Sequence, residues 1–271
     1  MVQKSIMIKG MKVIILCGGK GTRLGMEANY MPKAMVKVGH HPIIWHVMKR
    51  YSLAGYNDFI LALGKGGDSI RDYFLKYSLH TNDINLSLKD SRIKELTQHQ
   101  ETDWNVTLVD TGDFAFSGAR IDRCKKYIND EDFMVTYSDS IANVDIKKLI
   151  EFHKKSKKIA TITGVVPQFR EFEFSVKKDL SVEIYETKKN TSDSSGRYTN
   201  GGFMVFKKEI FSYLSSFNEC KLETEVFKHL IEDEQIAISP HSGFWRWLDT
   251  DRDYDYLNYL ADKNDMPWLQ E

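Results

Sequence analysis

Residues 12–17 (KVIILC) form a continuous apolar run that leads into the loop Gly18-Gly19-Lys20-Gly21-Thr22-Arg23-Leu24. An unbroken run of this kind is typical of a strand that is buried on both faces, as in a parallel sheet. Glycines directly after such a strand let the backbone approach a ligand, and their N–H groups can bind phosphate oxygens. The stretch therefore predicts an α/β sheet with a phosphate-binding loop. A flexible turn between strand and helix is the alternative explanation for the glycines.

The rest of the chain alternates predicted strands and helices, and its second half is richer in strands. We expect strands at residues 12–17, 58–63, 105–109, 132–137, 159–166, 181–185, 203–206 and 235–239, and helices at 42–54, 67–79, 118–128, 145–155 and 251–262. Such alternation predicts a mixed, mainly parallel sheet with helices on both faces. His46, inside the predicted helix 42–54, is expected to be a packing or interface histidine.

The charge of the chain is balanced, with 38 Lys and Arg against 38 Asp and Glu in 271 residues. Nucleic-acid-binding proteins usually carry a basic excess, so this balance argues against that class. Three scattered cysteines without a CxxC pair indicate a reducing compartment, and the apolar run at 13–17 is far too short to span a membrane. We therefore expect a cytoplasmic protein with one domain over 11–271, a short extension at 1–10, and no nucleic-acid or membrane partner.

Three charged residues beyond the glycine loop are candidates for chemistry, although each type alone is more often solvated than functional. Lys33 follows Pro32, whose fixed backbone can direct the lysine toward the loop, where it would neutralise a triphosphate. Asp139 comes directly after the predicted strand 132–137, at the edge of the sheet where ligands bind. Asp139 and Asp249 are carboxylates from distant segments that can hold one Mg²⁺ together with substrate phosphates.

The glycine loop and Pro32-Lys33 resemble the signature of the sugar-1-phosphate nucleotidyltransferases. The closer similarity is to the glucose-1-phosphate cytidylyltransferases, and it covers nearly the whole chain from Met11. The segments that carry it are 42–48 (PIIWHVM), 104–112 (WNVTLVDTG), 200–203 (NGGF) and 243–245 (GFW). The segment at 104–112 is the most specific, because nucleotidyltransferases in general lack it.

The resemblance implies a Rossmann-like fold, a homo-oligomer (a hexamer), Mg²⁺, and a reaction of CTP with a sugar 1-phosphate that gives a CDP-sugar and pyrophosphate. Residues 11–157 would be mainly nucleotide-binding, and 158–271 would form a smaller acceptor-binding and oligomerisation elaboration. The resemblance assigns Arg23, Lys33 and Asp139 to catalysis, Asp139 and Asp249 to the metal, Leu16, Gly18, Gly19, Gly21, Thr22, Thr111, Gly112 and Arg120 to the nucleotide, and Glu186, Lys188, Asn200 and Gly201 to the acceptor. Such a reaction needs positioning and charge stabilisation more than a covalent nucleophile.

Two departures from the family pattern fall on the acceptor side. The family has Gly-Asp-Gly where this chain has Ser138-Asp139-Ser140, and Glu-Lys-Pro where it has Glu186-Thr187-Lys188. Three hypotheses follow: a cytidylyltransferase for glucose 1-phosphate, a cytidylyltransferase for another phosphorylated acceptor that need not be a sugar, and a non-catalytic CTP-binding regulatory protein. The presence of both metal aspartates argues against the third, because binding alone does not require them.

Overall fold

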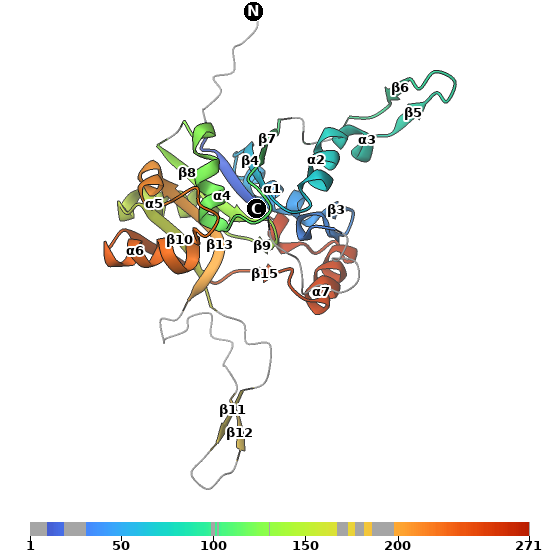
Figure 1. Ribbon diagram of the computed structural model, residues 1–271. Helices are drawn as coiled ribbons and strands as arrows, with labels where there is room; N and C mark the ends of the chain where they lie inside the picture. Colours follow the sequence, from blue (N-terminus) through green and yellow to red (C-terminus); the bar gives the residue numbers. More distant parts are fainter. Residues whose placement is uncertain are drawn as a thin grey trace, which may run out of the picture.

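A seven-stranded sheet forms the centre of the computed structural model, in the order β14-β10-β13-β8-β1-β4-β7 (Figure 1). The structure describes residues 10–18, 31–98, 101, 103–129, 131–166, 173–176, 182–185 and 198–270, with the backbone alone at 173–176 and 182–185. The strands are β1 (Val13–Cys17), β4 (Asp58–Leu63), β7 (Asn105–Asp110), β8 (Asp132–Tyr137), β10 (Ala160–Val165), β13 (Thr199–Lys207) and β14 (Ile236–His241). β13 runs antiparallel to β8 and β10, and the other neighbours are parallel. The predicted mixed, mainly parallel sheet is confirmed.

Helices cover both faces of this sheet, so the molecule has three layers. On one face, Ile14 and Leu16 of β1 pack in a cluster with residues of α4 (Ser117–Arg123) and α6 (Phe227–Glu232). On the other face, Val13, Ile15 and Cys17 pack with residues of α1 (Ile43–Leu53), α2 (Gly67–Leu75) and α5 (Ile146–Ser156). Side chains of β1 thus alternate between two buried faces, which explains why its sequence is apolar without interruption.

Three of the expected elements differ from the structure in more than their end residues. The helix expected at 67–79 is divided at Lys76 into α2 and α3 (Tyr77–Thr81), and the Tyr77 hydroxyl accepts a hydrogen bond from Trp45 Nε1. The helix expected at 118–128 ends at Arg123 and is followed by the 3-10 turn η3 (Lys125–Tyr127). The strand expected at 181–185 is β12 (Val182–Tyr185), which pairs with β11 (Glu173–Val176) in a separate hairpin and not in the central sheet.

A third apolar cluster joins the C-terminal part of the chain to the region around α1. It contains residues of α7 (Asp251–Asp262) and the fully buried Trp268. The Trp268 indole N–H donates to His46 Nδ1 at 3.1 Å, and His46 Nε2 lies 2.8 Å from the carbonyl oxygen of Val38. His46 is therefore a packing residue, as expected.

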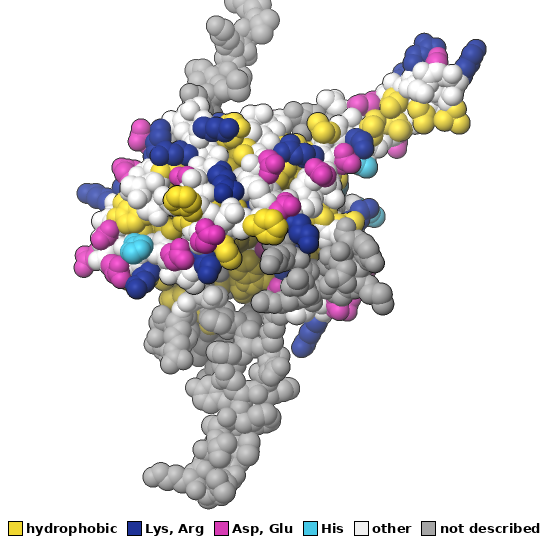
Figure 2. All heavy atoms as spheres, in the orientation of Figure 1, with side chains coloured by type: hydrophobic (Ala, Val, Ile, Leu, Met, Phe, Trp, Pro, Cys, Tyr) yellow, Lys and Arg dark blue, Asp and Glu magenta, His cyan; other side chains and the backbone are white. Residues whose placement is uncertain are grey.

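A two-stranded arm extends from the body of the molecule after α3. It consists of β5 (Ile84–Leu86) and β6 (Ile93–Glu95), which pair antiparallel with Leu86 opposite Ile93. The arm projects at the upper right of Figure 1, and Figure 2 shows a band of hydrophobic side chains along it. The large exposed apolar side chains of this segment are Ile84, Leu86, Leu88, Ile93 and Leu96.

Candidate active site

Lys33, Asp139 and Asp249 meet beyond the carboxyl end of β8, at the edge of the sheet where α/β proteins bind ligands. The Lys33 ammonium lies 2.5 Å from Asp249 Oδ1 and 3.4 Å from Asp139 Oδ2. The two aspartates are 106 and 216 residues from Lys33 in the sequence. The fold therefore brings together three residues that the sequence proposed separately.

A short sheet pairing places the two aspartates side by side. β9 (Ser140–Ala142) begins directly after Asp139 and pairs antiparallel with β15 (Trp245–Trp247), with Ser140 opposite Trp247. The backbone N–H of Leu248 then donates to the carbonyl oxygen of Asp139 at 2.9 Å. Since Asp249 is the next residue, this pairing determines which carboxylate stands beside Asp139.

The electrostatics of the three residues favour a bound cation. The side chains of Lys33, Asp139 and Asp249 are only 14%, 22% and 21% exposed. Burial raises the pKa of Asp139, the Lys33 ammonium counteracts this shift, and the neighbouring Asp249 carboxylate raises the pKa further. A cation between the two carboxylates therefore stabilises their charged forms.

Two carboxylates around one cation also fit the ligand preference of Mg²⁺, which takes oxygen ligands and usually completes its shell with water and substrate phosphates. In the part of the chain that the structure describes, no group of three or more His, Cys, Asp and Glu side chains is placed to hold a metal. Two carboxylates supply two oxygen ligands, which would leave the remaining ligand positions of Mg²⁺ to substrate and water.

Arg120 connects the carboxyl ends of three neighbouring strands. Its guanidinium donates to the carbonyl oxygens of Leu63 at 3.1 Å and Gly18 at 3.3 Å, and to Thr111 Oγ1 at 2.7 Å. A fourth contact reaches the carbonyl oxygen of Asp113 at 3.4 Å. The residue is only 3% exposed. Arg120, predicted to contact the nucleotide, therefore also holds the ends of β1, β4 and β7 in place.

The glycines around Arg120 are required by close packing. A Cβ on Gly18 would lie 2.1 Å from the guanidinium, and one on Gly64 would lie 2.4 Å from it. Gly112, in the turn after β7, has φ +79°, a conformation that favours glycine. The side chain of Leu16, also predicted on the nucleotide side, packs in the core beneath the sheet. Gly18 and Gly112 thus have structural reasons to be glycine whatever ligand they meet.

On the acceptor side, the structure describes Asn200 and Gly201, both in β13. Asn200 Oδ1 accepts from the backbone N–H of Gly202 at 2.9 Å, and the Gly201 carbonyl oxygen accepts from Trp245 Nε1 at 2.9 Å. The other predicted site residues, Gly19, Gly21, Thr22, Arg23, Glu186 and Lys188, lie outside the described residues. Their roles stay predictions.

The two serines that replace family glycines are both buried. Ser138 is 7% exposed and Ser140 is fully buried. Gly202, with φ +88°, faces Ser140, and a Cβ there would lie 2.8 Å from Ser140 Oγ. Among the described residues, Ser140 Oγ has no hydrogen-bond partner. The serine thus fits beside Asp139 and adds a polar group next to the acceptor-side residues.

Sequence reasoning missed two residues next to this site, Tyr137 and Glu223. Tyr137 ends β8 two residues before Asp139, and its hydroxyl donates to Glu223. The proximity of Tyr137 to Asp139 in the sequence is a signal that could have identified it. Glu223 is 86 residues away and carries no local signal.

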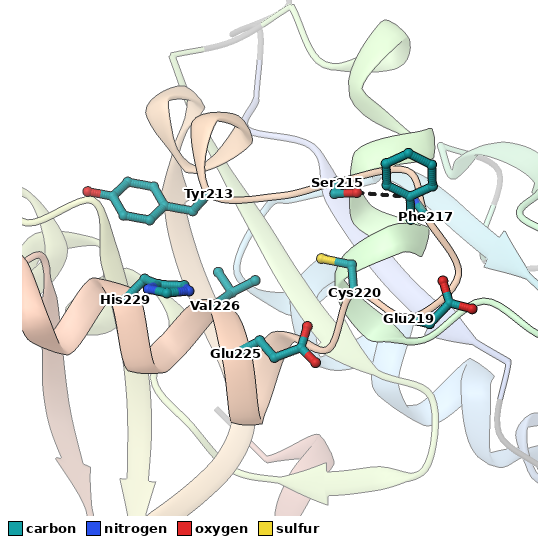
Figure 3. A pocket seen from close by; sticks show the side chains of 8 residues that line it. All are labelled: Tyr213, Ser215, Phe217, Glu219, Cys220, Glu225, Val226 and His229. Atoms are coloured by element: carbon teal, nitrogen blue, oxygen red, sulfur yellow. Dashed lines mark hydrogen bonds between the residues drawn. The ribbon is translucent and has the colours of Figure 1, made fainter.

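A pocket of about 270 Å³ lies elsewhere, between the segment 213–220 and residues 225–229 of η5 (Leu222–Val226) and α6. Figure 3 shows Tyr213, Cys220, Val226 and His229 among its lining side chains. Burial raises the pKa of the Cys220 thiol, so this cysteine is poorly suited to act as a nucleophile. None of the candidate site residues that the structure describes lines this pocket, so we assign it no role in the site around Asp139.

The fold and the charged site define an α/β protein of the nucleotidyl transferase class, and the family profile described as "Nucleotidyl transferase" matches residues 12–264. The glucose-1-phosphate cytidylyltransferase of Salmonella typhimurium is 38% identical over 259 residues, which cover 95% of this chain and 98% of the relative. A Bacillus subtilis protein named "probable glucose-1-phosphate cytidylyltransferase" is 35% identical over 95% of this chain and 99% of its own length. The chain belongs to the nucleotidyl transferase family, among the glucose-1-phosphate cytidylyltransferases.

Solved structures share the fold at lower identity. The UTP-bound UGPase from Acinetobacter baumannii superposes with a TM-score of 0.68 at 19% identity, covering 96% of this chain and 95% of that one. A likeness at this identity supports the α/β fold alone. Separately, none of the helices in the described residues combines the length and apolar character needed to cross a membrane.

Proposed function

We propose that the protein transfers the cytidylyl group of CTP to glucose 1-phosphate and releases pyrophosphate. The observation that carries this proposal is the Lys33 ammonium between the carboxylates of Asp139 and Asp249, in a chain 38% identical to a glucose-1-phosphate cytidylyltransferase over nearly its whole length. We further propose a cytoplasmic enzyme in which 11–157 bind mainly the nucleotide and 158–271 mainly the acceptor. The site residues predicted from the sequence, including those outside the described residues, keep their proposed roles.

In the proposed reaction, an acceptor phosphate oxygen attacks the α-phosphorus of CTP as the bond to pyrophosphate breaks. Asp139 and Asp249 would hold Mg²⁺. A bound Mg²⁺ would act as a Lewis acid and neutralise negative charge on the phosphates. Lys33 is proposed to stabilise the negative charge that grows on pyrophosphate, together with Arg23. Asn200 and Gly201 would position the acceptor, since orientation contributes a large part of the barrier lowering in such transfers.

Pyrophosphate release with CTP and Mg²⁺ tests the proposal, with glucose 1-phosphate as acceptor. Lys33→Ala and Asp139→Asn are expected to lower kcat by about 10² or more, because each removes a charge placed for the transition state. Lys155→Ala and Asp262→Asn remove the same charges at exposed positions of the surface and are expected to keep wild-type rates. Near-normal turnover by Asp139→Asn would contradict the metal assignment, and CTP binding without turnover would favour a regulatory protein.

Ser140 supports a second proposal, that the phosphorylated acceptor differs from glucose 1-phosphate. The family has glycine at position 140, and the buried Ser140 hydroxyl adds a polar group there, beside Gly202. This proposal predicts a different phosphorylated acceptor, with the CTP side unchanged. A panel of phosphorylated acceptors separates the two cases. No pyrophosphate release with glucose 1-phosphate, but release with another acceptor, would favour the different acceptor. Turnover with glucose 1-phosphate would mean that the acceptor-side serines are tolerated.

We also propose that the protein is a homo-oligomer. The arm β5–β6, which lies outside the residues 158–271 that the resemblance assigned to oligomerisation, supports this proposal, because an isolated two-stranded hairpin is only marginally stable in water. Leu86 and Ile93 are directly opposite one another and are 48% and 49% exposed. Apolar side chains on a projecting arm are typical of an interaction surface.

A further inference from the structure

The hydroxyl of Tyr137 lies between a carboxylate and an amide next to the candidate site. It donates to Glu223 Oε1 and accepts from Asn200 Nδ2 at 3.3 Å. A carboxylate can only accept and an amide NH₂ can only donate, so the phenol proton must point toward Glu223. The accepting oxygen of Glu223 therefore determines which side of the hydroxyl faces Asn200.

Glu223 is itself held by a contact with a neighbouring helix, α4. It lies in η5 (Leu222–Val226), a single turn of π-helix, and such turns occur frequently at functional sites. Buried Leu222 and Val226 anchor this turn in the core. Glu223 Oε2 accepts from Ser117 Oγ at 2.7 Å, at the start of the helix that carries Arg120. One carboxylate thus connects α4 to the end of β8.

The amide of Asn200 is fixed at both ends. Its oxygen accepts from the backbone N–H of Gly202 at 2.9 Å, and its nitrogen donates to the Tyr137 hydroxyl. The Tyr137 ring lies against the same turn, since a Cβ on Gly202 would come within 2.9 Å of it. The ring also contacts Trp247, with centroids 5.4 Å apart. Tyr137 has little freedom to move, so its hydroxyl is a stable partner for Asn200.

We propose that Glu223 and Tyr137 are positioning residues for the acceptor: Glu223 orients the Tyr137 hydroxyl, and the hydroxyl orients the Asn200 amide that meets the phosphorylated acceptor. This inference rests on the proposed function. The hydrogen bonds from Glu223 through Tyr137 to Asn200 end on the acceptor side. Loss of these hydrogen bonds therefore affects acceptor binding more than CTP binding.

The test measures KM for glucose 1-phosphate, KM for CTP, and kcat in four variants: Tyr137→Phe, Glu223→Ala, Glu223→Gln and the double variant Tyr137→Phe/Glu223→Ala. Tyr137→Phe and Glu223→Ala are expected to raise KM for glucose 1-phosphate about tenfold, the usual scale for one lost hydrogen bond to a charged partner, with KM for CTP unchanged. Because both residues act through one chain of bonds, the double variant is expected to match the single variants. Glu223→Gln keeps an accepting oxygen and is expected to retain most acceptor affinity.

Tyr213→Phe is the matched control. Tyr213 makes the same type of bond, donating to Asp233 Oδ2 at 2.7 Å, but its partners lie outside the candidate site. It is expected to leave both KM values unchanged. Melting temperatures of all variants identify any loss of folding, and exposed Glu223 provides a second test if Tyr137→Phe is unstable.

Three results would overturn the inference. Unchanged KM for glucose 1-phosphate in the folded variants contradicts the positioning role, and an equal rise of both KM values indicates a general structural role. A wild-type protein that shows no turnover with glucose 1-phosphate contradicts the proposed function and, with it, this inference. That failure is recognised in the wild type, before any variant is compared.

Discussion

At the scale of single residues, His46 has a protonation state that its hydrogen bonds determine. Trp268 can only donate, so His46 Nδ1 accepts and Nε2 carries the proton that is donated to the Val38 carbonyl oxygen. Burial lowers the pKa of His46 to about 4 from its ordinary value of 6.5. The folded protein therefore holds this histidine neutral at pH 5, whereas the unfolded chain protonates it.

This difference predicts that stability falls as the pH falls from 7 toward 4. Because His46 binds a proton in the unfolded chain but not in the folded protein, its contribution lowers the free energy of unfolding by about 2 kcal/mol between pH 7 and pH 5. Urea unfolding at the two pH values measures the loss. His46→Gln is expected to show a smaller pH dependence by that amount, and exposed His80→Gln is expected to keep the wild-type dependence. Equal pH dependence in wild type and His46→Gln would contradict the assignment.

At the scale of elements, α7 is linked to the candidate site through its N-terminal cap. Thr250 caps the helix, with its Oγ1 accepting from the backbone N–H of Asp253. Asp253 Oδ2 in turn accepts from the backbone N–H groups of Thr250 at 3.0 Å and Asp249 at 3.3 Å. The capping box thus also holds the backbone of the proposed metal ligand Asp249.

Thr250→Ala is therefore expected to affect both stability and catalysis. Loss of an N-cap side chain costs about 1 kcal/mol. The rate constant kcat is expected to fall as well, because the Thr250 hydroxyl no longer donates to the Asp253 carboxylate that holds the Asp249 N–H. Asp145→Ala is the matched control, since Asp145 caps α5 by accepting from Lys148 N. It is expected to lose similar stability and keep its kcat. If both variants keep kcat, the cap has no part in positioning Asp249.

At the scale of the whole molecule, the arm β5–β6 gives a test of self-association. Leu86 and Ile93 form a cross-strand pair on one face of the arm, whereas Asn85 faces the other side, opposite Lys94. Leu86→Lys places a charge in the proposed contact and is expected to weaken association at least about tenfold. Asn85→Lys is expected to leave association unchanged. Sedimentation of wild type and both variants at micromolar concentration provides the measurement, and a monomeric wild type would contradict the proposal.

Local pattern accounts for most of the strands and for Asp139 as a candidate residue, whereas most of the other candidates came from the resemblance. The apolar run of β1 predicted a strand buried on both faces, and Asp139 was expected where β8 ends. The division of the 67–79 helix at Lys76 was not predicted, because the spacing of its apolar residues is helical on both sides of Lys76. Likewise, β12 has a strand-like sequence, but periodicity does not indicate whether a strand joins the central sheet or a separate hairpin.

The sequence by itself determined the α/β class, the mainly parallel sheet and the resemblance that identified the candidate residues, because these depend on spacing and residue type along short segments. Only the tertiary structure decided that Lys33 stands between Asp139 and Asp249, that Arg120 joins the ends of three strands, and that Glu223 reaches Tyr137. The physical reason is that these contacts connect residues far apart in the chain. Their geometry depends on strand order and on the register of β9 with β15, which no local pattern encodes.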